Sequence, residues 1–102
     1  MKTLESTRTN NIIKYLNSHK RCLVRKRYQD GMSVQGDPDI TGCVAGGIHI
    51  ELEVKQPGNY PTKIQKLRML EWETAGAIVA CVHDVNEVKA LLELHNIKLD
   101  PK

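Results

Sequence analysis

The stretch from Ile48 to Lys55, IHIELEVK, alternates apolar and polar residues without a break. Successive side chains of a β-strand point to opposite faces, so this pattern predicts a strand with one apolar and one polar face. Pro57 and Gly58 follow after Gln56 and end it. The polar face carries four ionisable residues: His49, Glu51, Glu53 and Lys55. At this point the face is open to two interpretations, the solvated side of an antiparallel sheet or a functional surface.

The rest of the pattern predicts a single α/β domain over residues 1–102. The expected elements are a helix over 4–18, strands over 22–28, 39–44 and 47–55, a helix over 62–75, a strand over 77–83 and a helix over 84–95. Candidate core positions on the first helix are Leu4, Ile12, Ile13 and Leu16.

The connections predict how these strands pair. A loop is expected over 29–38, and the glycines at 45–47 indicate a hairpin between the second and third strands. The helix before the last strand permits a right-handed parallel crossover. The continuous apolar run of that last strand is typical of a covered sheet interior. We therefore expect a central mixed β-sheet flanked by helices, in the order α-β-β-β-α-β-α.

Positive charge is concentrated in the first third of the chain. Residues 1–36 hold eight Lys or Arg against two acids, whereas residues 37–102 hold seven against ten. The segment KRCLVRKR contributes five of the basic residues: Lys20, Arg21, Arg25, Lys26 and Arg27. Such a density attracts a polyanion such as a nucleic-acid backbone, although a solvated surface is the alternative.

Other classes of protein are not indicated. No apolar run approaches the roughly 20 residues that cross a bilayer, and the amino terminus lacks the apolar stretch of a signal peptide. A cytoplasmic protein without a membrane partner is therefore expected. Cys22, Cys43 and Cys81 are widely spaced, which predicts reduced thiols rather than a disulfide framework or a zinc site.

Two carboxylates are expected to meet across the hairpin. Asp39 starts the strand that should pair with 47–55, so it can approach Glu53, with Lys55 nearby. Converging carboxylates repel one another unless a cation lies between them, and oxygen-rich sites suit Mg²⁺ or Mn²⁺. Such a site supports metal-assisted phosphodiester hydrolysis, in which the ion polarises the phosphate and acidifies a water while a lysine stabilises the developing charge.

Pro38-Asp39 followed by Glu53-Val54-Lys55 resembles the PD-(D/E)XK nuclease signature. Further features, which span nearly the whole chain, look like the VRR-NUC branch of that superfamily in its small stand-alone form from phages and bacteria. They are Glu5 ahead of IIKYL, GDPDITG, ELEVKQPG, and Gln65 followed by Gly76. The resemblance implies a restriction-endonuclease-like core and a location in a bacterial host cell, and it leaves open whether the chain is encoded by the host or by a phage.

The resemblance also implies roles for the residues of the signature. Asp39 and Glu53 would bind the metal. The backbone carbonyl of Val54 would complete its coordination, and Lys55 would help to activate the water.

Five other residues have less defined roles. By the same resemblance Glu5 adds an outer or second-metal carboxylate, and Gln65 orients a water, the phosphate or the site lysine. The alternative for Glu5 is a first-turn acid favoured by the helix dipole, and the alternative for Gln65 is an ordinary polar residue near a helix start. The family pattern does not require Asp37, His49 or Glu51. Asp37 is open to a role in shaping the turn before Pro38. His49 and Glu51 are open to two roles: hydrogen bonding to the metal ligands, or simple solvation.

The predicted function is that of a Mg²⁺- or Mn²⁺-dependent DNA endonuclease. The resemblance of small stand-alone members to Holliday-junction resolvases favours branched DNA, and a chain of this size has little room for a base-reading element. One alternative is a non-catalytic nucleic-acid-binding module with a nuclease-like fold. Another is a metal-dependent enzyme that acts on nucleotides or another phosphoester.

A homodimer is expected, because a symmetric junction needs two incisions at related positions. On the second helix, Ile64, Leu67 and Leu70 are expected to face the core, whereas Met69 and Trp72 project to another side. This extra apolar surface predicts a dimer contact, and a wide core-facing stripe is the alternative.

Overall fold

The computed structural model describes residues 4–28, 31 and 33–102. Its elements are α1 (Glu5–Asn17), β1 (His19–Lys20), β2 (Leu23–Lys26), β3 (Ile40–Val44), β4 (Ile48–Val54), α2 (Lys63–Thr74), β5 (Ile78–Val82), α3 (Val85–Leu94) and β6 (Asp100–Pro101). The predicted helix and strand order is confirmed, and the two-residue strands β1 and β6 are additional. Residues 29, 30 and 32 of the expected loop lie outside the described residues.

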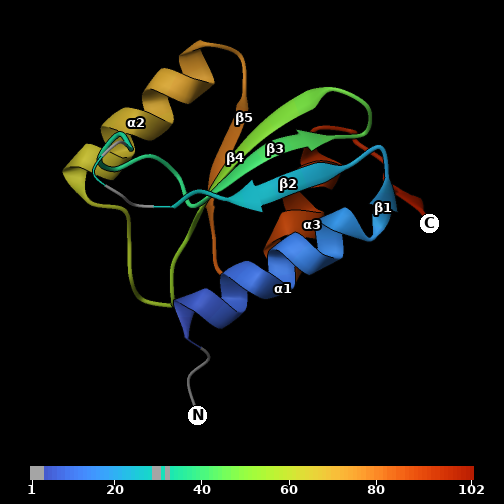
Figure 1. The fold of residues 1–102 in the computed structure, drawn as a ribbon, viewed down its shortest axis with the longest axis horizontal. Helices are drawn as coiled ribbons and strands as arrows, with labels where there is room; N and C mark the ends of the chain where they lie inside the picture. Colours follow the sequence, from blue (N-terminus) through green and yellow to red (C-terminus); the bar gives the residue numbers. More distant parts are fainter. Residues whose placement is uncertain (1–3, 29–30, 32) are drawn as a thin grey trace.

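Four strands form the mixed sheet that the sequence predicts, in the order β2-β3-β4-β5. β3 pairs antiparallel with both β2 and β4, and β5 pairs parallel with β4. The position of β5 corrects one expectation. Helices contact it from both sides of the sheet, but it is an edge strand and most of its residues are only half-buried (Figure 1).

The close approach of β2, β3 and β4 depends on the hairpin loop at 45–47 and on Gly42. The loop at 45–47 has positive φ at all three residues, and the ladder beyond it pairs Ile40 with Leu52. On the other side of β3, a Cβ on Gly42 would lie 2.1 Å from the carbonyl oxygen of Leu23. Only glycine lets β2 approach this closely.

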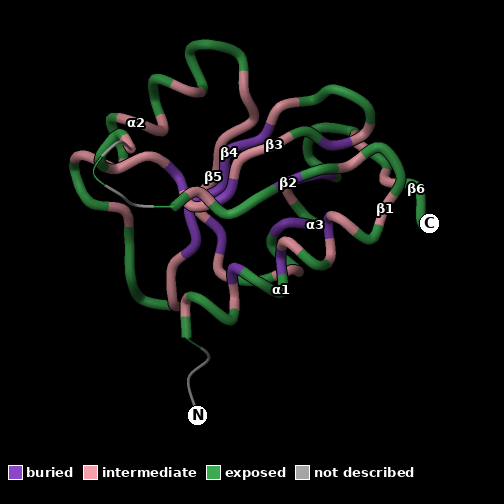
Figure 2. Tube along the Cα trace, viewed as in Figure 1, coloured by how far each residue is buried: buried purple, intermediate pink, exposed green. Residues whose placement is uncertain are grey.

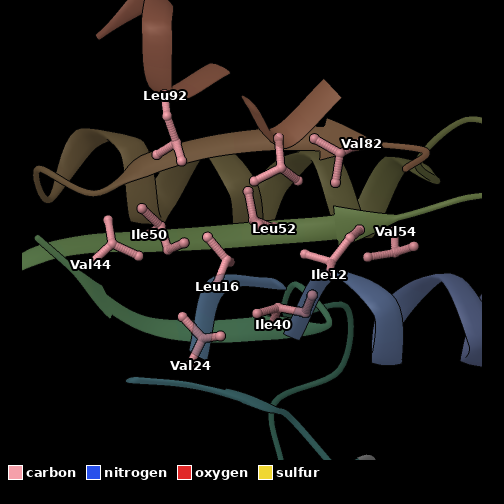
Figure 3. Close-up of a cluster of buried hydrophobic side chains, with 11 residues drawn as sticks. Ile12, Leu16, Val24, Ile40, Val44, Ile50, Leu52, Val54, Val82 and Leu92 are labelled. Carbon is pink, nitrogen blue, oxygen red and sulfur yellow. The ribbon is translucent and has the colours of Figure 1, made fainter. Parts of the chain in front are cut away.

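α1 and α3 cover one face of the sheet, and α2 covers the other (Figure 1). The apolar core lies between the sheet and α1 and α3 (Figure 3). Its buried residues are Ile12, Leu16, Val24, Ile40, Val44, Ile50, Leu52, Val54, Val82, Val88 and Leu92. Leu4 was expected in this core but is 64% exposed, because it is the N-cap residue of α1 and precedes the helical stripe.

α2, all of which the structure describes, contains no fully buried residue (Figure 2). The expected orientation of this helix is wrong. Leu67 and Leu70 are 49% and 58% exposed, whereas Met69 and Trp72 are half-buried. The sheet face beneath α2 carries charged groups, and Trp72 suits it because an indole offers both a ring and an N–H donor. Met69 and Trp72 therefore do not supply a free apolar surface.

The remaining strands, β1 and β6, form a small antiparallel ribbon in which His19 pairs with Pro101. This ribbon ties the carboxyl-terminal residues to the end of α1. Among the described residues, a helix with the length and apolar character needed to cross a membrane is not found.

Candidate metal centre

Asp39 and Glu53 meet at the open end of the β3–β4 hairpin. The ladder pairs Ile40 with Leu52, so the next pair outward is Asp39 with Glu53. The two side chains share a hydrogen bond. Asp39 Oδ2 also accepts the backbone N–H of Val54 at 2.8 Å, which orients the carboxylate toward β4. A short hairpin thus brings together two residues that are 14 positions apart in the sequence.

Glu53 has an unusual environment for a carboxylate. Its side chain is almost fully buried, and its Oε2 has no hydrogen-bond partner among the residues that the structure describes. Burial, the hydrogen bond with Asp39 and the charge of Asp39 raise the pKa of Glu53 to about 9, against the opposing effect of Lys55. A buried carboxylate oxygen without a partner is costly, and a bound cation is one way to satisfy it.

The donor atoms fit a hard divalent cation. The carboxylates of Asp39 and Glu53, together with the predicted backbone carbonyl of Val54, are oxygen ligands of the kind that Mg²⁺ and Mn²⁺ prefer. Within the described ranges, three or more His, Cys, Asp or Glu side chains are nowhere grouped to hold a metal. The charge of Glu5 reaches Glu53 and raises its pKa, but Glu5 does not complete such a group. Mg²⁺ often retains several waters, so two carboxylates suffice for it.

Three further residues lie around the carboxylates or were expected there. Lys55 is half-buried, and its charge favours the ionised form of Glu53. Cys81 is the β5 partner of Glu53, and burial together with the Glu53 charge raises the pKa of its thiol. Gln65 belongs to the capping box of α2, where its Oε1 accepts the Thr62 N–H at 2.9 Å. The cap gives Gln65 a structural role and uses only its amide oxygen.

The basic residues predicted to bind nucleic acid do not form one surface. Arg25 and Lys26 are exposed, and strand alternation directs them to opposite faces of β2. Lys20 is exposed in β1, and Arg21 forms an exposed ion pair with Asp100 at 3.6 Å. The fifth member of the predicted cluster has a different environment.

Arg27, that fifth member, forms a buried ion pair with Glu51. The Glu51 side chain is 0% exposed and the Arg27 side chain 16%. Nη1 and Nη2 of Arg27 lie 2.6 and 3.3 Å from the two carboxylate oxygens. Thr41 donates its hydroxyl to Glu51, and His49 Nε2 lies 2.6 Å from it. The polar face of β4 is therefore not simply solvated. It carries the ion pair of Arg27 with Glu51 in addition to the carboxylate pair of Asp39 with Glu53.

A signal for this ion pair exists in the sequence, although it is weak. Arg25 lies on a face of β2 that continues through β3 to the face of Glu51, and Arg27, immediately after β2, is next in the alternation on that face. Strand periodicity alone does not say which of the two arginines turns inward.

Comparison with known proteins found similar solved structures. The sequence matches no protein-family model and no curated protein. A solved structure described as a VRR_NUC domain is 26% identical, covers 87% of this chain and 94% of that chain, and gives a TM-score of 0.71. A second, described as a VRR_NUC domain protein, is 18% identical, covers 91% and 88%, and gives a TM-score of 0.73. The second likeness shows the fold alone.

The first match supports a VRR-NUC family assignment, the family that the motifs of this chain resemble. The fold is a mixed α/β fold of the restriction-endonuclease-like type. The description of the matched domains supports a nuclease-family function.

Proposed function

We propose that this protein is a divalent-metal-dependent DNA endonuclease that hydrolyses phosphodiester bonds. One observation carries the proposal: Glu53 is buried beside Asp39 and Lys55, and its Oε2 finds no partner in the described part of the chain. Asp39, Glu53 and the carbonyl of Val54 are the groups that would hold Mg²⁺ or Mn²⁺. When bound, such an ion supplies polarisation of the phosphate and a more acidic water.

The chain's own side chains complete the proposed chemistry. Lys55 stabilises the negative charge that develops on the phosphate and orients the attacking water. Glu5, in the first turn of α1, provides an outer carboxylate for a water or a second ion. Gln65 contributes its amide Nε2, because its Oε1 caps α2.

We propose branched DNA as the substrate. Arg25 and Lys26 extend from the edge strand β2 into solvent, and Lys20 and Arg21 are exposed close by in the sequence. Exposed arginine and lysine side chains bind phosphates, which fixes position and senses shape without reading bases.

We also propose that the protein acts as a homodimer, since two incisions at a symmetric branch require two active sites. The apolar side chains that α2 exposes are Leu67 and Leu70, so this pair replaces Met69 and Trp72 as the proposed contact.

A substrate panel tests the proposed activity. With Mg²⁺, the wild-type protein should cleave four-way junctions in preference to linear, nicked or flap DNA. Asp39→Asn, Glu53→Gln and Lys55→Ala should each lower the cleavage rate by about 100-fold or more, because each removes a group that stabilises the transition state. Their DNA affinity, measured by fluorescence anisotropy, should remain near that of the wild type.

Glu73→Gln, which neutralises an exposed acid on α2, serves as the control and should cleave normally. Wild-type protein that binds every DNA and cleaves none would instead support a non-catalytic binding module. Hydrolysis of nucleotides alone would support a phosphoesterase.

A further inference from the structure

Arg27 contacts the segment that carries Asp39 in several ways. Its Nη1 donates to the carbonyl oxygen of Pro38 at 2.7 Å, and its backbone N–H donates to the carbonyl oxygen of Asp39 at the same distance. Its Nε lies 3.9 Å from Oδ2 of Asp37. Arg27, whose side chain is largely buried, thus contacts the backbone of Pro38 through its guanidinium and that of Asp39 through its own backbone N–H, and it approaches the side chain of Asp37.

The guanidinium of Arg27 is itself held from two sides. Glu51 on β4 binds it through both carboxylate oxygens. From α2, the Trp72 ring lies 5.3 Å from the guanidinium carbon, and the indole N–H donates to Asp37 Oδ1 at 3.1 Å. The His49 ring stacks on Trp72 at 5.2 Å. These contacts connect α2, β4 and the residue after β2 to the three-residue segment that leads into β3.

We propose that Arg27 and Glu51 are positioning residues of the metal centre. Their side chains fix the backbone at Pro38, and through it the position of Asp39, so that the Asp39 carboxylate reaches both the Val54 N–H and Glu53. The inference rests on the proposed function in one respect, the assignment of Asp39 as a metal ligand. A displacement of about 1 Å in a catalytic group costs about 100-fold in rate, which is why such a ligand needs a rigid support.

Stability alone does not account for this ion pair. Replacing a buried ion pair with apolar residues of similar size is often neutral or stabilising, because desolvation of two charges is costly. The pair instead connects the middle of β4 to the backbone of Pro38, the residue immediately before Asp39. Residues that orient metal ligands in this way typically change metal affinity or activity by about 10- to 100-fold when they are replaced.

Because a buried ion pair tolerates replacement by apolar residues of similar size, such a replacement supplies the test. The double variant Arg27→Met, Glu51→Met keeps an apolar filling of the site while it removes the guanidinium's hydrogen bond to Pro38; the backbone hydrogen bond between residue 27 and Asp39 is retained. It should fold normally by circular dichroism. In metal-free protein, hydrogen exchange at the Val54 amide should accelerate about tenfold or more, because its acceptor is the Asp39 carboxylate. The amide of Ile50, in the middle of the same strand, should be unaffected.

The second measurement is the affinity for Mn²⁺ by calorimetry, which should weaken by about 10- to 100-fold in the double variant. Arg68→Met is the matched control, because Arg68 binds the backbone carbonyl of Gln35 in the same loop, at 3.1 Å, without reaching Asp39. It should leave both readouts unchanged. Arg27→Lys should fold and give an intermediate Mn²⁺ affinity, since it keeps the charge but loses the fork that reaches both Glu51 and Pro38.

A folded double variant with wild-type exchange at Val54 would overturn the proposal. Failure of both the double variant and Arg27→Lys to fold would also overturn it, because the pair would then be required for folding itself. The exchange measurement needs neither metal nor DNA. A wild-type protein that cleaves no DNA would therefore count against the proposed function only. Hydrogen exchange at the Val54 amide would still decide whether Arg27 and Glu51 are positioning residues.

Discussion

Glu51 and Glu53 lie two residues apart on the same face of β4, and both are almost fully buried, yet their surroundings differ. Glu51 is paired with Arg27 and accepts the hydroxyl of Thr41. Glu53 faces another carboxylate, and its pKa is raised to about 9. At neutral pH the metal-free protein therefore keeps a proton on Glu53 that a divalent cation would displace.

The raised pKa of Glu53 predicts how the stability of metal-free protein depends on pH. In the unfolded chain this carboxyl group has its ordinary pKa of 4.5, so between pH 4.5 and about 9 the folded state binds more protons. The contribution of Glu53 to the free energy of unfolding is present in full below pH 4.5 and is lost as pH rises toward 9. In Glu53→Gln this loss is absent. As pH rises over this range, the free energy of unfolding of the variant should therefore increase relative to that of the wild type by up to about 1.4 kcal/mol per pH unit.

Thermal melts in chelator across pH 5 to 9 provide the measurement of this difference. Glu73→Gln, at an exposed position, should follow the wild-type curve. Curves for Glu53→Gln and the wild type that stay parallel over this range would show that Glu53 titrates normally. Added Mg²⁺ should stabilise the wild type more than Glu53→Gln, because ligand binding to the folded state raises its stability.

At the scale of elements, β2 and Arg27, the residue that follows it, combine two functions. Arg27 turns inward, where it pairs with Glu51, while Arg25 and Lys26 remain exposed. The strand lies at the edge of the sheet, and Gly42 on β3 holds it close. The same short segment can therefore support the metal centre and present cations to a polyanion.

Replacing the exposed cations of β2 should affect DNA binding without regard to DNA shape. Arg25→Ala and Lys26→Ala should each weaken binding to every substrate and reduce the slope of log affinity against log salt by about 0.9 for each phosphate that is no longer neutralised. Fluorescence anisotropy over a series of salt concentrations measures this slope. Lys98→Ala, which removes an exposed charge beyond α3, should leave it unchanged. An unaltered slope in both β2 variants would place DNA elsewhere.

At the scale of the whole molecule, the two faces of the sheet differ in kind. α1 and α3 bury an aliphatic core on one face, whereas α2 covers ion pairs and an aromatic stack on the other. Because α2 packs with its half-buried polar and aromatic side chains, it leaves Leu67 and Leu70 in solvent.

If this exposed pair forms the proposed dimer contact, the double variant Leu67→Glu, Leu70→Glu should be folded but monomeric by sedimentation velocity. It should still nick a four-way junction while losing paired cuts. Leu94→Glu, at a leucine of α3 that is 77% exposed, is the control and should remain dimeric. A wild-type protein that sediments as a monomer, both alone and on a junction, would remove the dimer from the proposal.

Local sequence patterns were sufficient for the element order and for the meeting of Asp39 with Glu53. Strand periodicity and a three-residue hairpin loop determine which residues of adjacent strands face one another, and both act over short distances along the chain. For the same reason the start of α3 agrees with the helix expected over 84–95: its N-cap is Asp84, and capping involves only the first turn.

Only the tertiary structure decided what covers the polar face of β4. The pairing of Arg27 with Glu51 joins residues 24 positions apart, and Trp72 reaches the same cluster from a helix still further along the chain. The orientation of α2 depended on this cluster, since an amphipathic pattern assigns leucines to an apolar sheet face and this face is charged. Hydrophobic periodicity records which residues are apolar, whereas the charge of the facing surface depends on long-range packing that the pattern does not contain.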